Sequence, residues 1–286
     1  MKGLKLYTAI AYGLIWTVGI VFLLTGAEYQ SLAGTITATG CMLFPLVATL
    51  ICQAVSHEPL LRNIGIHWHV NRWWFIGILL IFVIVALTIL FTSCISGFST
   101  DTEVLRALCE QMKMPLGAAL AITIAFGLIS GLTINALLAF GEEVGWRGYL
   151  LRQFHGQPFI STAIFIGLIW GLWHAPLILL GHNYPQHPGV GVLFMMLMCT
   201  PLAIIIQYVR LKSGSVIVAA IMHGTFNALA GLSIFFVEQR NELLDGGPGI
   251  CGILALIVVA FGLFLYDRYG SKERLFTRPL DIEDLK

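Results

Sequence analysis

Two adjacent carboxylates and an arginine end a long apolar run in the middle of the chain. Residues 140–148 contain Glu142 and Glu143, and Arg147 follows four positions after the second. An ionisable group at the centre of a membrane helix costs roughly 2.5–3.5 kcal/mol on insertion scales, so such groups generally mark functional sites. On a helix, Glu143 and Arg147 can form an ion pair. That pair would leave Glu142, rotated by about 100°, free for chemistry.

Two later apolar segments are also interrupted by polar residues. His174 follows Trp170 by one helical turn, and Asn227 follows His223 by one turn, so each pair shares a helix face. Three helices could therefore direct a carboxylate, two imidazoles and an amide into one cavity. These groups supply a general base, a second base and oxyanion donors, which are the parts of a hydrolase. Because no serine or cysteine stands out as a nucleophile, they favour attack by a water that Glu142 and His174 activate.

Each of these residues also has a structural interpretation. His174 or His223 alone could make an interhelical hydrogen bond, and Asn135 is expected to be such a packing residue. The pair Glu143 and Arg147 could be a structural ion pair at the membrane interface.

The water mechanism requires no cofactor, and we expect none. The alternative is a zinc-dependent hydrolase in which Glu142, His174 and His223 are the three protein ligands. The sequence contains no HExxH motif. Haem ligation by the two histidines is a further possibility.

The composition is that of an integral membrane protein. Hydrophobic residues make up 58% of the chain and charged residues 11%, against about 25% in soluble domains, which excludes a water-soluble globule. The formal charge of +1 gives no reason to expect nucleic-acid binding. Apolar windows of about 20 residues predict an all-α bundle of about eight transmembrane helices. They lie near residues 7–26, 34–54, 73–94, 116–141, 158–181, 189–209, 214–237 and 249–267.

The predicted helices divide the chain into residues 1–115, a core at 116–237 that carries the site, and 238–286 with the last helix and a tail. Of the 16 Lys and Arg residues, only Arg106, Lys113 and Arg240 fall on one side of the membrane. Because basic short loops stay cytoplasmic, we predict a multi-pass protein of the cell membrane with both termini cytoplasmic and the first apolar run retained. Residues 101–113 predict a short amphipathic surface helix, and the tail from Tyr269 is expected to be flexible.

Three histidines and two cysteines lie in or beside the predicted loops. His155, His182 and His187 are expected to be solvated, because each lies beside a glycine or proline. Cys94 and Cys109 flank one polar connection and could pair in an oxidising compartment.

Helix lengths impose one condition on the site. At 1.5 Å per residue, His223 lies about 14 Å and His174 about 24 Å from the cytoplasmic ends of their helices, whereas Glu142 lies at the end of its own. We therefore predict that the helix of Glu142 continues toward Leu151 and that the next helix begins later than residue 158.

The order and spacing of these residues resemble the CPBP family, the CAAX proteases and bacteriocin-processing enzymes also called Abi. Three family motifs are matched: EExxxR by Glu142, Glu143 and Arg147; FxxxH by Trp170 and His174; and HxxxN by His223 and Asn227. The one departure is tryptophan in place of phenylalanine.

The resemblance implies an intramembrane endopeptidase of the glutamate type that acts on a membrane-associated protein or peptide. It assigns water activation to Glu142 and His174 and the oxyanion hole to His223 and Asn227. It gives supporting roles to Glu143, Arg147 and the aromatic Trp170. Some bacterial relatives are linked to bacteriocin immunity or to scaffolding of cell-envelope proteins. The alternative function is therefore a non-proteolytic immunity or scaffold protein.

Overall fold

Eight helical segments of the computed structural model, which describes residues 2–285, are long and apolar enough to cross a membrane. No strand occurs among the described residues, so the all-α prediction is confirmed. The eight segments are Lys2–Thr25, Leu32–Val55, Arg72–Ser96, Leu116–Leu150, Phe159–Leu179, Pro188–Ser213, Val216–Phe236 and Ile250–Tyr269.

Several of these segments consist of more than one helix. Four of the eight segments are single helices: α1 (Lys2–Thr25), α4 (Arg72–Ser96), α10 (Pro188–Ser213) and α12 (Ile250–Tyr269). The others are α2 (Leu32–Cys41) with α3 (Phe44–Val55); α6 (Leu116–Leu132) with α7 (Ile134–Glu143) and η1 (Val144–Leu150); α8 (Phe159–Trp173) with α9 (Ala175–Leu179); and α11 (Val216–Leu229) with η2 (Leu232–Phe236).

Proline explains two of these interruptions. Pro45 lies in the first turn of α3 and Pro176 in the first turn of α9. Proline is favourable there because the first helical N–H groups have no intrahelical acceptor, but it cannot continue a preceding helix undisturbed. The second interruption places His174 at the junction of α8 and α9.

The helix of Glu142 does continue beyond this residue, as the depth argument predicts. After Glu143 the chain forms the π-helical segment η1, in which every residue from Val144 to Leu150 is buried. Segments of π-helix are rare and often accompany functional sites. The next helix, α8, begins at Phe159, one residue later than the limit of 158.

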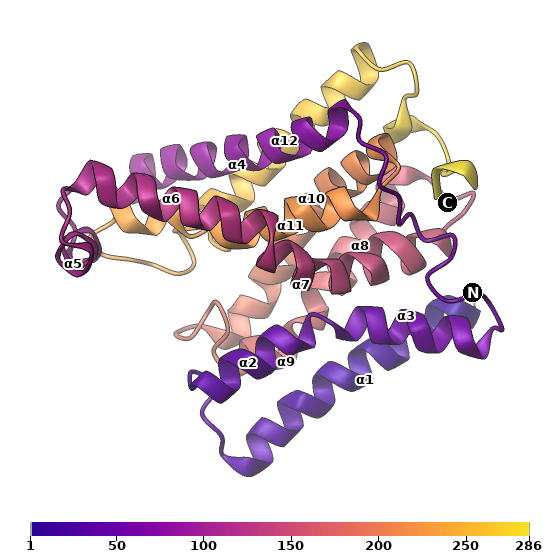
Figure 1. The fold of residues 1–286 in the computed structure, drawn as a ribbon, viewed down its shortest axis with the longest axis horizontal. Coiled ribbons are helices and arrows are strands. Elements are labelled where there is room, and N and C mark those ends of the chain that lie inside the picture. Colours follow the sequence, from indigo (N-terminus) through magenta and orange to yellow (C-terminus); the bar gives the residue numbers. More distant parts are fainter. Residues whose placement is uncertain (1, 286) are drawn as a thin grey trace.

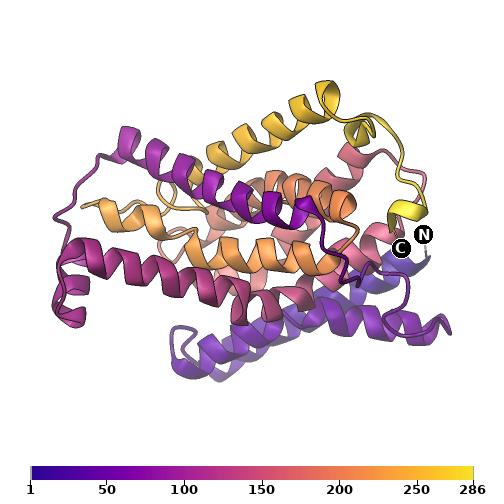
Figure 2. The ribbon, with the colours of Figure 1, turned by 45° about the horizontal axis from the view of Figure 1, so that its top comes forward.

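Helices α8, α10 and α11 form the centre of the bundle, with α1 and α3 along one side and α4 and α12 along the other (Figures 1 and 2). Glycines permit the closest approaches. A Cβ on Gly171 of α8 would lie 2.4 Å from the Cα of Met196 in α10, and one on Gly224 of α11 would lie 2.4 Å from the backbone N of Ala136 in α7. These contacts bring the elements that carry the polar residues together backbone to backbone.

The two termini lie at the same end of the bundle (Figure 1), as an even number of spans requires. The amphipathic helix is confirmed as α5 (Glu103–Met112), and it lies at the other end. Cys94 and Cys109 are both free, so the suggested disulfide is not formed.

The prediction of a flexible tail is wrong. Residues after Tyr269 form η3 (Leu275–Thr277) and η4 (Glu283–Leu285), and Arg278 makes an ion pair of 2.6 Å with Asp284. The physical reason is that the tail contains enough apolar residues to pack on the bundle, and three of its leucines are buried: Leu275, Leu280 and Leu285.

Candidate active site

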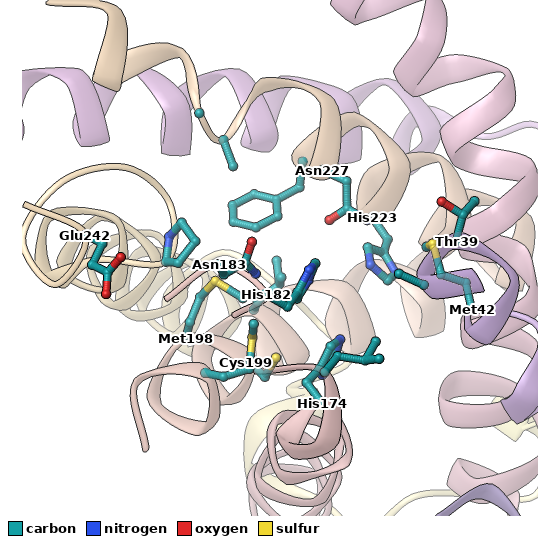
Figure 3. A pocket seen from close by; sticks show the side chains of 18 of the residues that line it. Thr39, Met42, His174, His182, Asn183, Met198, Cys199, His223, Asn227 and Glu242 are labelled. Atoms are coloured by element: carbon teal, nitrogen blue, oxygen red, sulfur yellow. The ribbon is translucent and has the colours of Figure 1, made fainter. Parts of the chain in front are cut away.

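A cavity of about 600 Å³ lies between α2, α8, α10 and α11, and all four residues predicted to be catalytic line it. Figure 3 shows His174, His223 and Asn227 around this space. They come from the junction of α8 and α9 and from successive turns of α11. The predicted convergence of polar side chains from three helices on one cavity is therefore present. The lining residues that the sequence singled out are Glu142, Trp170, His174, His223 and Asn227.

Glu142 lies in the last turn of α7 and is only 2% exposed. Its Oε2 accepts a hydrogen bond of 2.7 Å from the indole Nε1 of Trp170. A carboxylate in such surroundings requires donors, because an ionised group without partners is very costly to bury. The sequence indicated Trp170 only as an aromatic residue. Its role as a donor to Glu142 was missed, although the indole N–H that distinguishes tryptophan from phenylalanine was a visible signal.

His174 is held in one tautomer by its own helix. Its Nδ1 lies 2.8 Å from the carbonyl oxygen of Trp170. A carbonyl oxygen only accepts, so Nδ1 carries the proton of the neutral ring and Nε2 presents a lone pair. His174 can therefore accept a hydrogen bond from a water in the cavity.

Glu143 contacts both Arg147 and His223. The predicted ion pair with Arg147 is confirmed, with 2.8 Å between Nη1 and Oε1 and both side chains fully buried. The same Oε1 also accepts a hydrogen bond of 2.9 Å from Nδ1 of His223. The guanidinium of Arg147 lies 4.3 Å from the ring centroid of Trp170. The supporting residues thus fix both the ring that holds Glu142 and the imidazole of His223.

The loop histidines differ from one another. His155 is exposed, as predicted, and His187 is 44% exposed but pairs with Glu242. The prediction for His182 is wrong, because it lines the cavity and its Nδ1 lies 2.9 Å from the hydroxyl of Tyr29. The reason is tertiary: the connection between α1 and α2 covers this loop, which the sequence around His182 does not reveal.

Asn135 has the packing role expected of it. Its amide donates a hydrogen bond of 3.1 Å to the hydroxyl of Ser130, next to the break between α6 and α7.

The side chains do not fit the zinc alternative. Within residues 2–285, no three His, Cys, Asp or Glu side chains are grouped so that they could hold a metal ion. Glu142 and His223 instead make hydrogen bonds to Trp170 and Glu143.

Comparisons with known proteins cover the segment that carries these residues. Residues 125–229, which contain all three motifs, match the family described as type II CAAX prenyl endopeptidase, Rce1-like. The chain is also 31% identical over 146 residues to CAAX prenyl protease 2 of Methanococcus maripaludis, a match that covers 49% of this chain and spans 50% of that protein. Residues 125–229 are therefore similar to the type II CAAX prenyl endopeptidases, and the chain spans about half the length of the relative that it matches.

Proposed function

We propose that this protein is an intramembrane endopeptidase, similar to CAAX prenyl protease 2, that hydrolyses a peptide bond of a membrane-associated protein or peptide. One observation carries the proposal: the buried carboxylate of Glu142 shares a cavity with His174, His223 and Asn227. The family that residues 125–229 match and the relative from Methanococcus maripaludis support the same reaction class.

Glu142 and His174 are the residues that activate the water. The indole N–H of Trp170 binds one oxygen of Glu142 and leaves the other for the water. The lone pair on Nε2 of His174 orients the same water from a second side. As the water oxygen attacks the scissile carbonyl carbon, its proton passes to this pair. The same proton then goes to the leaving amine when the carbon–nitrogen bond breaks.

His223 and Asn227 stabilise the oxyanion that forms on the carbonyl oxygen. The side-chain amide of Asn227 is a donor in either protonation state of the site. Because Nδ1 of His223 faces a carboxylate, Nε2 can donate only when the ring is doubly protonated, and Glu143 is the counter-ion for that form. Preorganised donors of this kind typically contribute a factor of about 10²–10³ to turnover.

The proposal is tested by comparing the termini of membrane peptides in cells that produce the wild type or Glu142→Gln at equal abundance. Glu238→Gln, in the exposed connection after α11, is the matched control. We expect new termini with the wild type and the control that disappear with Glu142→Gln. Termini that persist in the Glu142→Gln cells would contradict the proposal.

Identical termini in all strains, with the cellular phenotype preserved, would favour the alternative of a non-proteolytic immunity or scaffold protein. The zinc-dependent alternative has its own readout. It requires stoichiometric zinc in the purified protein and loss of activity with chelators, whereas the water mechanism proposed here is insensitive to them.

The position of the cavity bears on where substrates enter. Its outer wall includes Tyr29, His182 and Pro248, which belong to the connections at the end opposite to the termini. The basic connections lie at the end with the termini, so we infer that this end is cytoplasmic. The cavity would then open away from the cytoplasm, toward a substrate segment on the outer face or within the bilayer.

This orientation can be tested with an impermeant maleimide in intact cells. Glu238→Cys should be labelled without permeabilisation and Lys272→Cys only after it, in a background in which the exposed Cys94 is serine. The reverse pattern would show that the cavity opens toward the cytoplasm.

A further inference from the structure

His182 is a third histidine of the cavity, and the mechanism above does not use it. It follows α9, where its backbone N–H donates a hydrogen bond of 3.0 Å to the carbonyl of Leu177. The turn depends on Gly181, whose φ of +100° is unfavourable for residues with a side chain. The position of His182 is therefore fixed by the end of the helix that begins after His174.

The partner of His182 determines which ring nitrogen carries the proton. Nδ1 lies 2.9 Å from the hydroxyl of Tyr29, and that hydroxyl has no other hydrogen-bond partner among residues 2–285. If Nδ1 carried the proton, the hydroxyl hydrogen of Tyr29 would have no acceptor in a half-buried place. The hydroxyl hydrogen has an acceptor only when Tyr29 donates to Nδ1 of His182. The proton of the neutral imidazole is then on Nε2.

Burial keeps both groups in this state at neutral pH. It lowers the pKa of His182 to about 4 and raises the pKa of Tyr29 to about 12. The ring is then a neutral donor and a poor proton acceptor. Its Nε2 makes no hydrogen bond to another side chain or to the backbone of residues 2–285.

The position of the ring relates it to the reacting groups. His182 lines the same cavity as His174, His223 and Asn227. Figure 3 shows its side chain in the middle of the view, with His174, His223 and Asn227 around it. A peptide that enters this largely apolar cavity loses water from its carbonyl groups, and each unpaired carbonyl is costly to bury.

We propose that His182 is a substrate-positioning residue: its Nε2–H donates a hydrogen bond to a backbone carbonyl of the bound peptide beside the scissile bond, and Tyr29 fixes the ring for this purpose. The inference rests on the proposed endopeptidase function. It assigns His182 to binding of the peptide backbone, and no proton moves through it.

The test uses purified protein in nanodiscs and a quenched fluorogenic peptide that spans a terminus found in the cell comparison. His182→Ala should lower kcat/KM about tenfold, because the carbonyl is left without its donor, and the change should lie mainly in KM. His182→Gln, which retains a donor near Nε2, should recover most of the loss. Tyr29→Phe should give a smaller loss of about threefold in kcat/KM. His155→Ala, at an exposed position outside the cavity, should cause no loss.

Two outcomes would overturn the inference: an unchanged KM for His182→Ala, or a loss confined to kcat. Glu142→Gln in the same assay separates the two proposals. Residual turnover in that variant contradicts the endopeptidase function itself, whereas an inactive Glu142→Gln beside a normal His182→Ala contradicts only the role of His182.

A second measurement does not depend on turnover. In protein labelled with ¹⁵N-histidine, the signals lost in His182→Gln identify this ring. They should show a protonated Nε2 and a bare Nδ1, and Tyr29→Phe should disturb that pattern. A ring protonated on Nδ1 in the wild type would overturn the inference regardless of activity.

Discussion

The buried ion pair of Glu143 and Arg147 provides a quantitative test of the site. Glu143 accepts the only side-chain hydrogen bond that Arg147 donates within residues 2–285, because Nε and Nη2 of the guanidinium have no partner. Glu143→Gln removes the counter-charge and leaves a fully buried cation against the ring of Trp170. A cation–π contact returns about 0.5–2 kcal/mol, whereas breaking a buried ion pair from one side costs about 3–5 kcal/mol.

We therefore expect Glu143→Gln to lower the free energy of unfolding by about 3 kcal/mol. The double variant Glu143→Gln/Arg147→Met should recover most of this loss, because it removes the buried guanidinium together with its counter-charge. The assay is reversible unfolding in mixed micelles of a mild detergent and SDS, followed by tryptophan fluorescence. Additive effects of the two substitutions, or a loss below about 1 kcal/mol for Glu143→Gln, would refute the reasoning.

The same pair of variants separates stability from chemistry. The double variant still lacks the carboxylate that binds Nδ1 of His223. Its turnover should therefore stay low although its stability is restored. Normal turnover in the double variant would mean that Glu143 and Arg147 form only a structural ion pair.

Three further results are expected. Trp170→Phe keeps an aromatic ring but removes the indole N–H that binds the carboxylate of Glu142, so turnover should fall about tenfold or more in the peptide assay; unchanged turnover would show that this bond is not needed. Gly171→Ala should destabilise the protein and reduce activity, because the new Cβ would lie 2.4 Å from the backbone of α10, whereas Gly117→Ala, with open space around it, should do neither. In the tail, burial alone would raise the pKa of Asp284, but the hydrogen bonds and charge of Arg278 lower it below its usual value. The stability from this depressed folded-state pKa is present above the unfolded value of about 3.9 and is lost as the pH falls through the folded one. The protection of the tail amides against hydrogen exchange, taken relative to their intrinsic exchange rates, should fall in acid, and Asp284→Asn should remove that pH dependence of the protection.

Much of the fold and of the candidate site could be predicted because both rest on local patterns. Apolar windows of membrane length gave the eight spans, since the bilayer sets their length. Residues four apart on one helix, such as Glu143 and Arg147, had to be neighbours, and they are. The requirement that Glu142 meet two histidines located deeper in the bundle predicted the continuation of its helix, which η1 provides.

The parts that could not be predicted depend on contacts between distant segments. The bond between His223 and Glu143 spans 80 residues, and that between Tyr29 and His182 spans 153. Neither has a pattern in the sequence. The packing of the tail was missed for a related reason, because its charged residues suggested solvation whereas Arg278 and Asp284 neutralise each other.

The central claim is that Glu142 activates the water that cleaves the peptide. The most direct measurement is the cleavage rate of the fluorogenic peptide by the purified wild type, Glu142→Gln and Glu238→Gln in nanodiscs, with folding of each checked by thermal unfolding. The mechanism predicts equal rates for the wild type and Glu238→Gln. It predicts a loss of at least about 10²–10⁴-fold, the usual contribution of a general base, for a folded Glu142→Gln. A folded Glu142→Gln that cleaves at the wild-type rate would contradict it.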